Sequence, residues 1–237
     1  MRRLLFACVS AVVILTYLND GARADMGPCH KVADGGILCG DGKNSALVID
    51  GTVSPSKRLA FAWREPDDVP KFNPGDVEML LVRLADGAIL AELKGEYWET
   101  ASGGRANRMD EWAAWSADSR LVVEIFNNRW DATITLYAIS ADDQVGKPVD
   151  LRDLVEKAAI ARFPNWGKGK LADHALRAAR GARFKKDGTL VLPVFLYVPK
   201  QDDPELRLDV TLAIMRNDAA VGAKVLSLRR ASWDAWN

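Results

Sequence analysis

A short turn followed by a hydrophobic strand occurs three times in this chain. The three segments read VSPSKRLAFAWR from Val53, WSADSRLVVEIF from Trp115 and FKKDGTLVLPVF from Phe184. Each turn leads into a strand through a leucine in the same register, which gives Leu59, Leu121 and Leu190. A recurring unit of this kind indicates a repeat architecture, and repetition constrains a fold more strongly than other local patterns. The sequence therefore predicts three related antiparallel β-meanders.

Alternation of side chains and turn residues predicts the individual strands. The predicted strands are 46–49, 59–63, 78–84, 88–93, 121–126, 132–139, 190–198, 206–215 and 224–228. Between the second and third units the period becomes helical. Asp150 is a suitable N-cap for a helix over 151–163, and a second helix is predicted over 170–180, before Gly181. The predicted fold class is mainly β: repeated antiparallel meanders, arranged as an incomplete propeller or an open sandwich, with a helical pair inserted at about 150–181.

The turn-and-strand segments resemble the S-P-D-G-K-x-L-A-F element of TolB-type, WD-like periplasmic β-propeller repeats. VSPSKRLAF matches most closely and WSADSRLVV next, whereas FKKDGTLVL keeps the Asp-Gly pair and the leucine. The match is confined to these short segments. Closed propellers have about 4–8 blades, so three units imply an incomplete or degenerate propeller, or an open β-sandwich. The resemblance implies an exported, β-rich scaffold that binds proteins or ligands, and it brings no catalytic residues.

The first 24 residues have the features of a signal peptide. Arg2 and Arg3 precede the apolar stretch 4–18, and Ala22 and Ala24 flank Arg23 before a cleavage point. The apolar stretch is shorter than a membrane-spanning helix, which needs about 20 residues. The alternative is that the segment stays uncleaved and anchors the protein in the membrane. We therefore expect residues 25–237 to form a single β-rich domain in the periplasm or outside the cell, with no transmembrane segment after cleavage.

The two cysteines beyond the signal segment predict a disulfide bond. Cys29 and Cys39 would be oxidised in an exported protein. The alternative is a metal site that includes His30, but it would have only three obvious ligands and lacks paired C-x-x-C spacing. We predict the disulfide, no metal site and no cofactor.

Charge argues against a nucleic-acid partner. The full chain carries 32 basic and 32 acidic residues, and removal of residues 1–24 would leave a slight acidic excess. Proteins that bind nucleic acids usually show a clear basic excess.

Few residues point to catalysis. The chain has two histidines and no G-x-S-x-G nucleophile motif, so no catalytic residue is predicted. Four basic side chains would share a face of the second predicted helix and form an anion or partner patch: Lys170, His174, Arg177 and Arg180. The alternative is a solvated helix face.

Tryptophans offer a second kind of binding feature. Trp98 adjoins a polar loop and is the candidate for stacking on a sugar or anchoring a partner protein. Trp63, Trp115 and Trp130 lie at or beside predicted strands, so we expect them in the core. Together these patterns favour an exported, non-catalytic binding or scaffolding protein of the bacterial cell envelope, with an envelope protein or saccharide as partner. The alternative is a hydrolase of envelope polymers with a cleft near residues 97–111.

Overall fold

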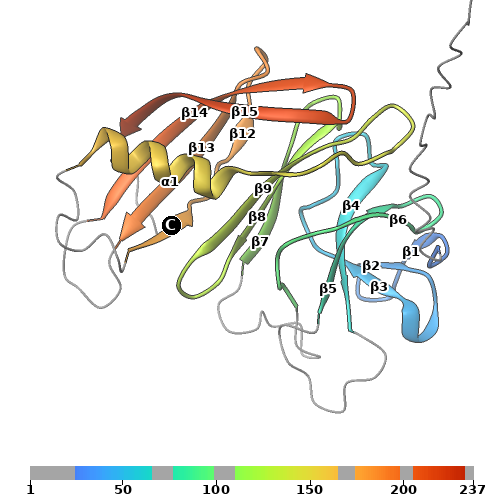
Figure 1. Ribbon diagram of the computed structural model, residues 1–237. Helices are drawn as coiled ribbons and strands as arrows, with labels where there is room; N and C mark the ends of the chain where they lie inside the picture. The colour runs from blue at the N-terminus through green and yellow to red at the C-terminus, as the bar shows by residue number, and fades with distance from the viewer. Residues whose placement is uncertain (1–24, 66–76, 99–109, 165–173, 198–204, 233–237) are drawn as a thin grey trace, which may run out of the picture.

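The computed structural model describes residues 25–65, 77–98, 110–164, 174–197 and 205–232, which form three antiparallel sheets in succession along the chain (Figure 1). Sheet 1 has the order β1-β2-β3-β4-β5-β6. Its strands are β1 (Cys29–Lys31), β2 (Ile37–Cys39), β3 (Ala46–Val48), β4 (Leu59–Arg64), β5 (Glu78–Arg83) and β6 (Ala88–Glu92), with a 3-10 turn at Gly42–Asn44. Each strand pairs with the next in sequence, as the meander prediction requires.

Sheet 2 continues this plan, with the order β10-β9-β8-β7. Sheet 3 has the order β11-β13-β14-β15, in which β11 and β12 both pair with β13. Sheet 2 consists of β7 (Asp110–Trp115), β8 (Leu121–Asn127), β9 (Ala132–Ala138) and β10 (Val149–Asp150). Sheet 3 consists of β11 (Ala175–Ala178), β12 (Arg183–Phe184), β13 (Leu190–Tyr197), β14 (Leu206–Asn217) and β15 (Ala220–Arg230). The prediction of a mainly β fold with an inserted helix is confirmed.

The repeated turn starts in the same way in all three units, but the third turn closes one residue earlier than the first two. In each unit the amide of the fourth residue donates to the carbonyl of the first, at 2.9 Å for Lys57–Ser54, 2.9 Å for Ser119–Ser116 and 3.0 Å for Gly188–Lys185. In the first two units, a serine hydroxyl accepts a hydrogen bond from the backbone amide of the leucine that begins the strand, at 3.1 Å for Ser54–Leu59 and 2.9 Å for Ser116–Leu121. The serine amide also donates to the carbonyl of that leucine, at 2.8 Å for Ser54 and 2.9 Å for Ser116, whereas in the third turn the amide of Lys185 donates to the carbonyl of Thr189, the residue before Leu190, at 2.8 Å. The last turn residue is left-handed in each unit, with φ of 57°, 59° and 80° at Lys57, Ser119 and Gly188. The first two sequence repeats thus form the same turn, and the third forms a related one that is one residue tighter.

The three turn leucines are buried. Leu59 is 3% exposed, Leu121 8% and Leu190 0%. Leu59 belongs to the hydrophobic cluster between sheets 1 and 2, whereas Leu121 and Leu190 belong to the cluster between sheets 2 and 3. Each turn therefore sets the register in which its strand enters an interface between sheets.

Polar contacts join the turns of neighbouring sheets. The backbone amide of Ser56 donates to Ser119 Oγ at 3.0 Å, which links the first two repeated turns. Asp143, in the turn after β9, accepts from Arg58 at 2.6 Å and from Arg83 at 3.0 Å. These contacts fix sheet 1 against sheet 2 along one edge of their shared interface.

The first predicted helix is confirmed as α1 (Leu151–Arg162). The Asp150 side chain caps it by accepting from the amide of Asp153 at 3.1 Å. Its buried residues, Leu151, Val155 and Ala159, pack into the cluster between sheets 2 and 3. In Figure 1 the helix lies along sheet 3.

The second predicted helix is wrong in the part that the structure describes. Ala175–Ala178 forms β11, which pairs antiparallel with β13. The Asn127 side chain adds two hydrogen bonds to the backbone of Ala178, donating at 2.8 Å and accepting at 3.1 Å. All four residues of β11 are buried. Local helical spacing was overridden by burial and pairing at a free strand edge, which are tertiary effects.

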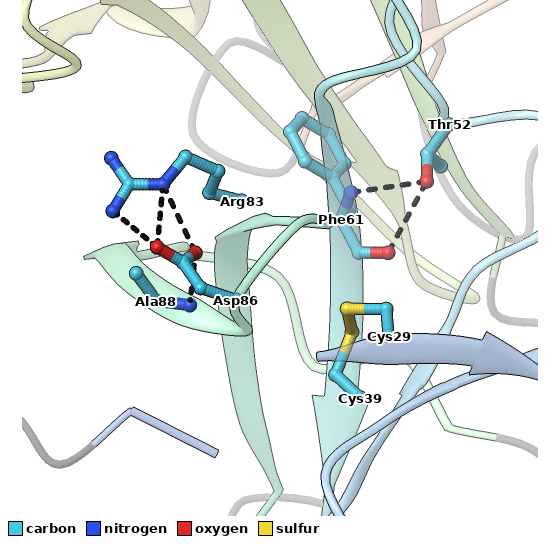
Figure 2. The surroundings of a disulfide bond; sticks show 7 residues. All are labelled: Cys29, Cys39, Thr52, Phe61, Arg83, Asp86 and Ala88. Atoms are coloured by element: carbon cyan, nitrogen blue, oxygen red, sulfur yellow. Dashed lines mark hydrogen bonds and ion pairs between the residues drawn. A yellow bond between two sulfur atoms is a disulfide. The ribbon is translucent and has the colours of Figure 1, made fainter. Parts of the chain in front are cut away.

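The predicted disulfide is present. Cys29 and Cys39 face each other in β1 and β2, with an S–S distance of 1.95 Å (Figure 2). The bridged segment also contacts the turn between β5 and β6, where the Cys29 amide donates to the carbonyl of Leu84 at 3.0 Å. That turn passes so close that a β-carbon on Gly87 would lie 2.0 Å from the Gly27 carbonyl oxygen. The disulfide thus fastens the N-terminal segment to the rest of sheet 1.

Replacing Cys29 and Cys39 together by serine is expected to lower the free energy of unfolding by about 2–3 kcal/mol, because the short closed loop then regains its freedom in the unfolded chain. Urea unfolding of the oxidised wild type and of the variant measures the difference. Adding reductant should destabilise the wild type and leave the variant unchanged. Two freely alkylated thiols in unreduced, exported protein would contradict the pairing.

Candidate functional site

Three polar side chains form a diagonal stripe on the face of sheet 2 that packs against sheet 1. Glu111 lies on β7, Glu124 on β8 and Tyr137 on β9. Glu124 stands opposite Ala113 in β7 and Thr135 in β9, so Glu111 and Tyr137 lie one diagonal step away on either side. Side chains at such positions are within reach of each other. We call these three residues the carboxylate stripe.

Glu124 is fully buried and holds three donors. Its Oε1 accepts from the backbone amides of Lys94 and Gly95, at 2.7 and 2.5 Å, and its Oε2 accepts from the Tyr137 hydroxyl at 2.8 Å. Burial raises the pKa of Glu124, and the three donors oppose that rise by favouring the charged form. Glu124 therefore ties sheet 2 to the segment after β6, and it is the member of the stripe best prepared to carry a negative charge.

Glu111 has the opposite environment. Its side chain is buried, and neither carboxyl oxygen has a hydrogen-bond partner among the described residues. Burial, and then the charge of Glu124, raise the pKa of Glu111 well above its usual range. The surroundings of Glu111 accordingly favour the neutral, protonated form of its carboxyl.

The two carboxyl groups approach the same glycine. A β-carbon on Gly95 would lie 2.6 Å from Glu111 Oε2 and 3.2 Å from Glu124 Oε1. Only a residue without a side chain leaves room for both groups. The charge of Glu124 therefore acts on Glu111 and disfavours ionisation of both groups at once.

Tyr137 completes the stripe as a neutral donor. Burial raises the pKa of Tyr137 far above its usual value, and the charge of Glu124 adds to this effect. The stripe thus combines a neutral acid, a hydrogen-bonded carboxylate and a phenol. Such a division of ionisation states between neighbouring groups suits proton transfer or the binding of a ligand with both donors and acceptors.

Aromatic side chains surround the stripe. The hydrophobic cluster between sheets 1 and 2 contains Trp63, Tyr97 and Phe126, and Phe126 stands directly opposite Glu111. Trp98, the predicted stacking residue, is partly buried and packs against this cluster. Of the predicted cleft at 97–111, residues 99–109 lie outside the described part of the chain.

The predicted basic patch does not form on one helical face. Lys170 lies outside the described residues. His174 Nε2 contacts Glu156 Oε1 at 2.5 Å. Arg177 is 9% exposed on β11, and burial lowers its pKa. Arg180 lies beyond β11, with its guanidinium 5.8 Å from the Trp112 ring centroid. The shared face depended on the second helix, which the strand β11 replaces.

The tryptophans expected in the core divide into two groups. Trp63 and Trp115 pack between sheets 1 and 2, as predicted. Trp130 is 48% exposed, so the prediction for this residue is wrong. It lies in the turn between β8 and β9 rather than on a strand, and its side chain therefore has no sheet face to pack on.

The described residues contain no group of three or more histidine, cysteine or acidic side chains able to hold a metal ion. None of the helices in the described ranges has the length and hydropathy needed to cross a membrane. Comparison of the chain with known protein families, curated proteins and solved structures gave no significant match.

Proposed function

We propose that this protein is an exported, non-catalytic binding module of the bacterial cell envelope, acting in the periplasm or outside the cell. The observation that carries the proposal is Glu111, whose two buried oxygens find no partner among the described residues. A buried polar group left without hydrogen bonds costs roughly 1–3 kcal/mol. Groups of this kind often mark a binding or catalytic site.

The chemistry of the stripe indicates the kind of ligand. A neutral carboxyl at Glu111 has one donor and spare acceptor capacity, whereas its neighbour Glu124 already accepts three hydrogen bonds, from Tyr137 and two backbone amides. A ligand group that both donates and accepts hydrogen bonds, such as a sugar hydroxyl or a peptide amide, would satisfy the carboxyl group of Glu111. Envelope polymers and envelope proteins carry such groups in abundance.

A further observation supports this assignment. The Cys29–Cys39 disulfide suits an oxidising compartment outside the cytoplasm. The resemblance to TolB-type, WD-like repeats is part of the proposal, and under it the three sheets are a partial propeller that serves as a scaffold. The prediction of an envelope protein or saccharide as partner belongs to the same proposal.

Affinity capture from envelope extract tests the proposal. The bait is the chain from Asp25 onward, compared with Glu111→Met, which removes both oxygens at similar volume, and with a matched exposed-site control, Glu65→Met. We expect the wild type and the control to retain the same saccharide or protein and the Glu111 variant to lose it, while circular dichroism shows all three folded. Equal capture by all three proteins would remove Glu111 from the site. No capture by the wild type would contradict a binding module.

A hydrolase of envelope polymers is the second candidate, and the unequal carboxyl pair is the observation that favours it. Glu111 would donate its proton to the leaving group as general acid, and the Glu124 carboxylate would activate water as general base. Release of soluble fragments from purified envelope polymer, with turnover beyond one equivalent, would establish this activity. Glu111→Gln and Glu124→Gln would then each lower the rate by about 10²–10⁴-fold.

A further inference from the structure

The turn between β8 and β9 presents an aromatic and a cationic side chain together. Trp130 is 48% exposed, although most large hydrophobic side chains in the described residues are buried. The guanidinium carbon of Arg129 lies 4.7 Å from the centroid of the Trp130 ring. A guanidinium at this distance is attracted to the ring face. We call these two residues the Arg129–Trp130 platform.

Hydrogen bonds hold the backbone of this turn in one conformation. Asn128 Oδ1 accepts from the backbone amides of Trp130 and Asp131, both at 2.8 Å. The backbone amide of Asn128 donates to the Asp131 carbonyl at 3.0 Å. The Tyr197 hydroxyl, from β13, donates to the Trp130 carbonyl at 2.7 Å. The residue that carries the exposed ring is thus fixed on both sides of its own backbone.

Asp131 anchors the same turn to two other elements. Its carboxylate accepts from Arg152 on α1 at 2.8 Å and from the backbone amide of Leu176 on β11 at 3.2 Å. Arg152 in turn pairs with Glu156 at 2.7 Å. Exposed loop turns are usually the more mobile parts of a domain, so this degree of anchoring is more than a simple connection needs. An aromatic group already fixed in place loses little entropy on binding a ligand.

The charges around the turn determine which ligand fits. Asp131 is engaged by Arg152, whereas Arg129 makes no ion pair within the described ranges and is exposed. A guanidinium binds carboxylate or phosphate oxygens through paired donors. The indole ring offers a flat apolar surface with a polar edge.

We propose that the Arg129–Trp130 platform binds a saccharide chain that carries carboxylate or phosphate groups. The indole packs against the C–H face of a sugar ring, and the Arg129 guanidinium binds the neighbouring anionic group. This site is separate from the carboxylate stripe and does not depend on it. The stacking role that the sequence suggested for Trp98 belongs, in this proposal, to Trp130.

Native electrophoresis in gels that contain a soluble polysaccharide tests the proposal. The probes are polygalacturonate, which carries carboxylates, a phosphorylated mannan, and neutral dextran. We expect one or both anionic polymers to retard the wild type, and dextran to leave its mobility unchanged. The two anionic probes show which of the two groups is preferred.

Variants assign the binding to the platform. Trp130→Ala and Arg129→Gln should each raise the Kd for the retarding polymer at least about tenfold, as for a central contact residue. Tyr197→Phe, which removes only the hydroxyl that holds the turn, should raise the Kd by a smaller factor. Leu226→Ala and Lys224→Gln on β15 are the matched controls, because they remove an exposed apolar side chain and a cation elsewhere, and both should bind like the wild type.

Four results would overturn the proposal. The first is a wild type that neither anionic polymer retards. The second is equal affinity in the wild type and both platform variants. The third is capture of an envelope protein through Trp130 without any polysaccharide binding, which would make the platform a protein-binding surface. Equal losses in the β15 controls would likewise contradict a specific site.

Discussion

Replacing Leu190 by alanine is expected to lower the free energy of unfolding by about 2–5 kcal/mol. Leu190 is 0% exposed and begins β13 inside the cluster between sheets 2 and 3. Truncation there removes apolar contact and leaves a cavity that the surrounding strands fill only in part. Urea unfolding followed by circular dichroism measures the change. It is a large fraction of the stability of a typical domain.

The control for this prediction is Leu226→Ala. Leu226 is 55% exposed on β15, and substitutions at such surface positions usually change stability by less than about 0.5 kcal/mol. A loss at Leu190 no greater than that at Leu226 would show that the third repeated turn does not direct its leucine into the core.

Replacing Glu111 by glutamine is expected to flatten the fall in stability toward high pH. The pKa of Glu111 is higher in the folded protein than in the unfolded chain, so its favourable contribution is complete below the unfolded value of about 4.3. As the pH rises above that value, the unfolded chain releases the proton and the folded protein keeps it. The wild type should therefore lose on the order of 1.4 kcal/mol per pH unit relative to the variant, until the folded pKa is reached.

Urea unfolding of both proteins at several pH values between 5 and 8 checks this expectation. The informative quantity is the difference between the two stabilities at each pH, because the pKa of Glu124 is also raised and its contribution has the same sign in both proteins. Glu65→Gln, at an exposed carboxyl, is the control, and its stability should change with pH in parallel with that of the wild type. Parallel curves for Glu111→Gln would mean that Glu111 is ionised in the folded state.

Much of the fold could be predicted because its signals are local. The turns before Leu59 and Leu121 each consist of a serine, a left-handed residue and the start of an apolar strand. All the contacts that define such a turn lie within a few residues of each other. Helix α1 likewise depends on its own cap at Asp150. β11 was missed because its conformation comes from a distant partner, β13, rather than from its own sequence.

The candidate site was harder to predict for the same reason. Glu124 interrupts an otherwise apolar strand, and that interruption was a usable signal of a buried acid. Glu111 carries no such mark, because its segment reads as the end of a polar loop and was not predicted as a strand. The two meet only through the register of β7 on β8, which aligns Ala113 with Glu124. Pairing register depends on the assembled sheet and cannot be read from either segment alone.

Both faces of sheet 2 are covered by neighbouring sheets. Along β8, Val122 and Phe126 pack toward sheet 1, whereas Leu121, Val123 and Ile125 pack toward sheet 3. During synthesis, the apolar face of sheet 1 that packs on sheet 2 therefore stays exposed until β8 and β9 have been made. The opposite face of β8 and β9 stays exposed until β13 has been made. Folding of the described sheets is in this sense a joint event, and a packing defect in β8 would loosen both of its neighbours at once.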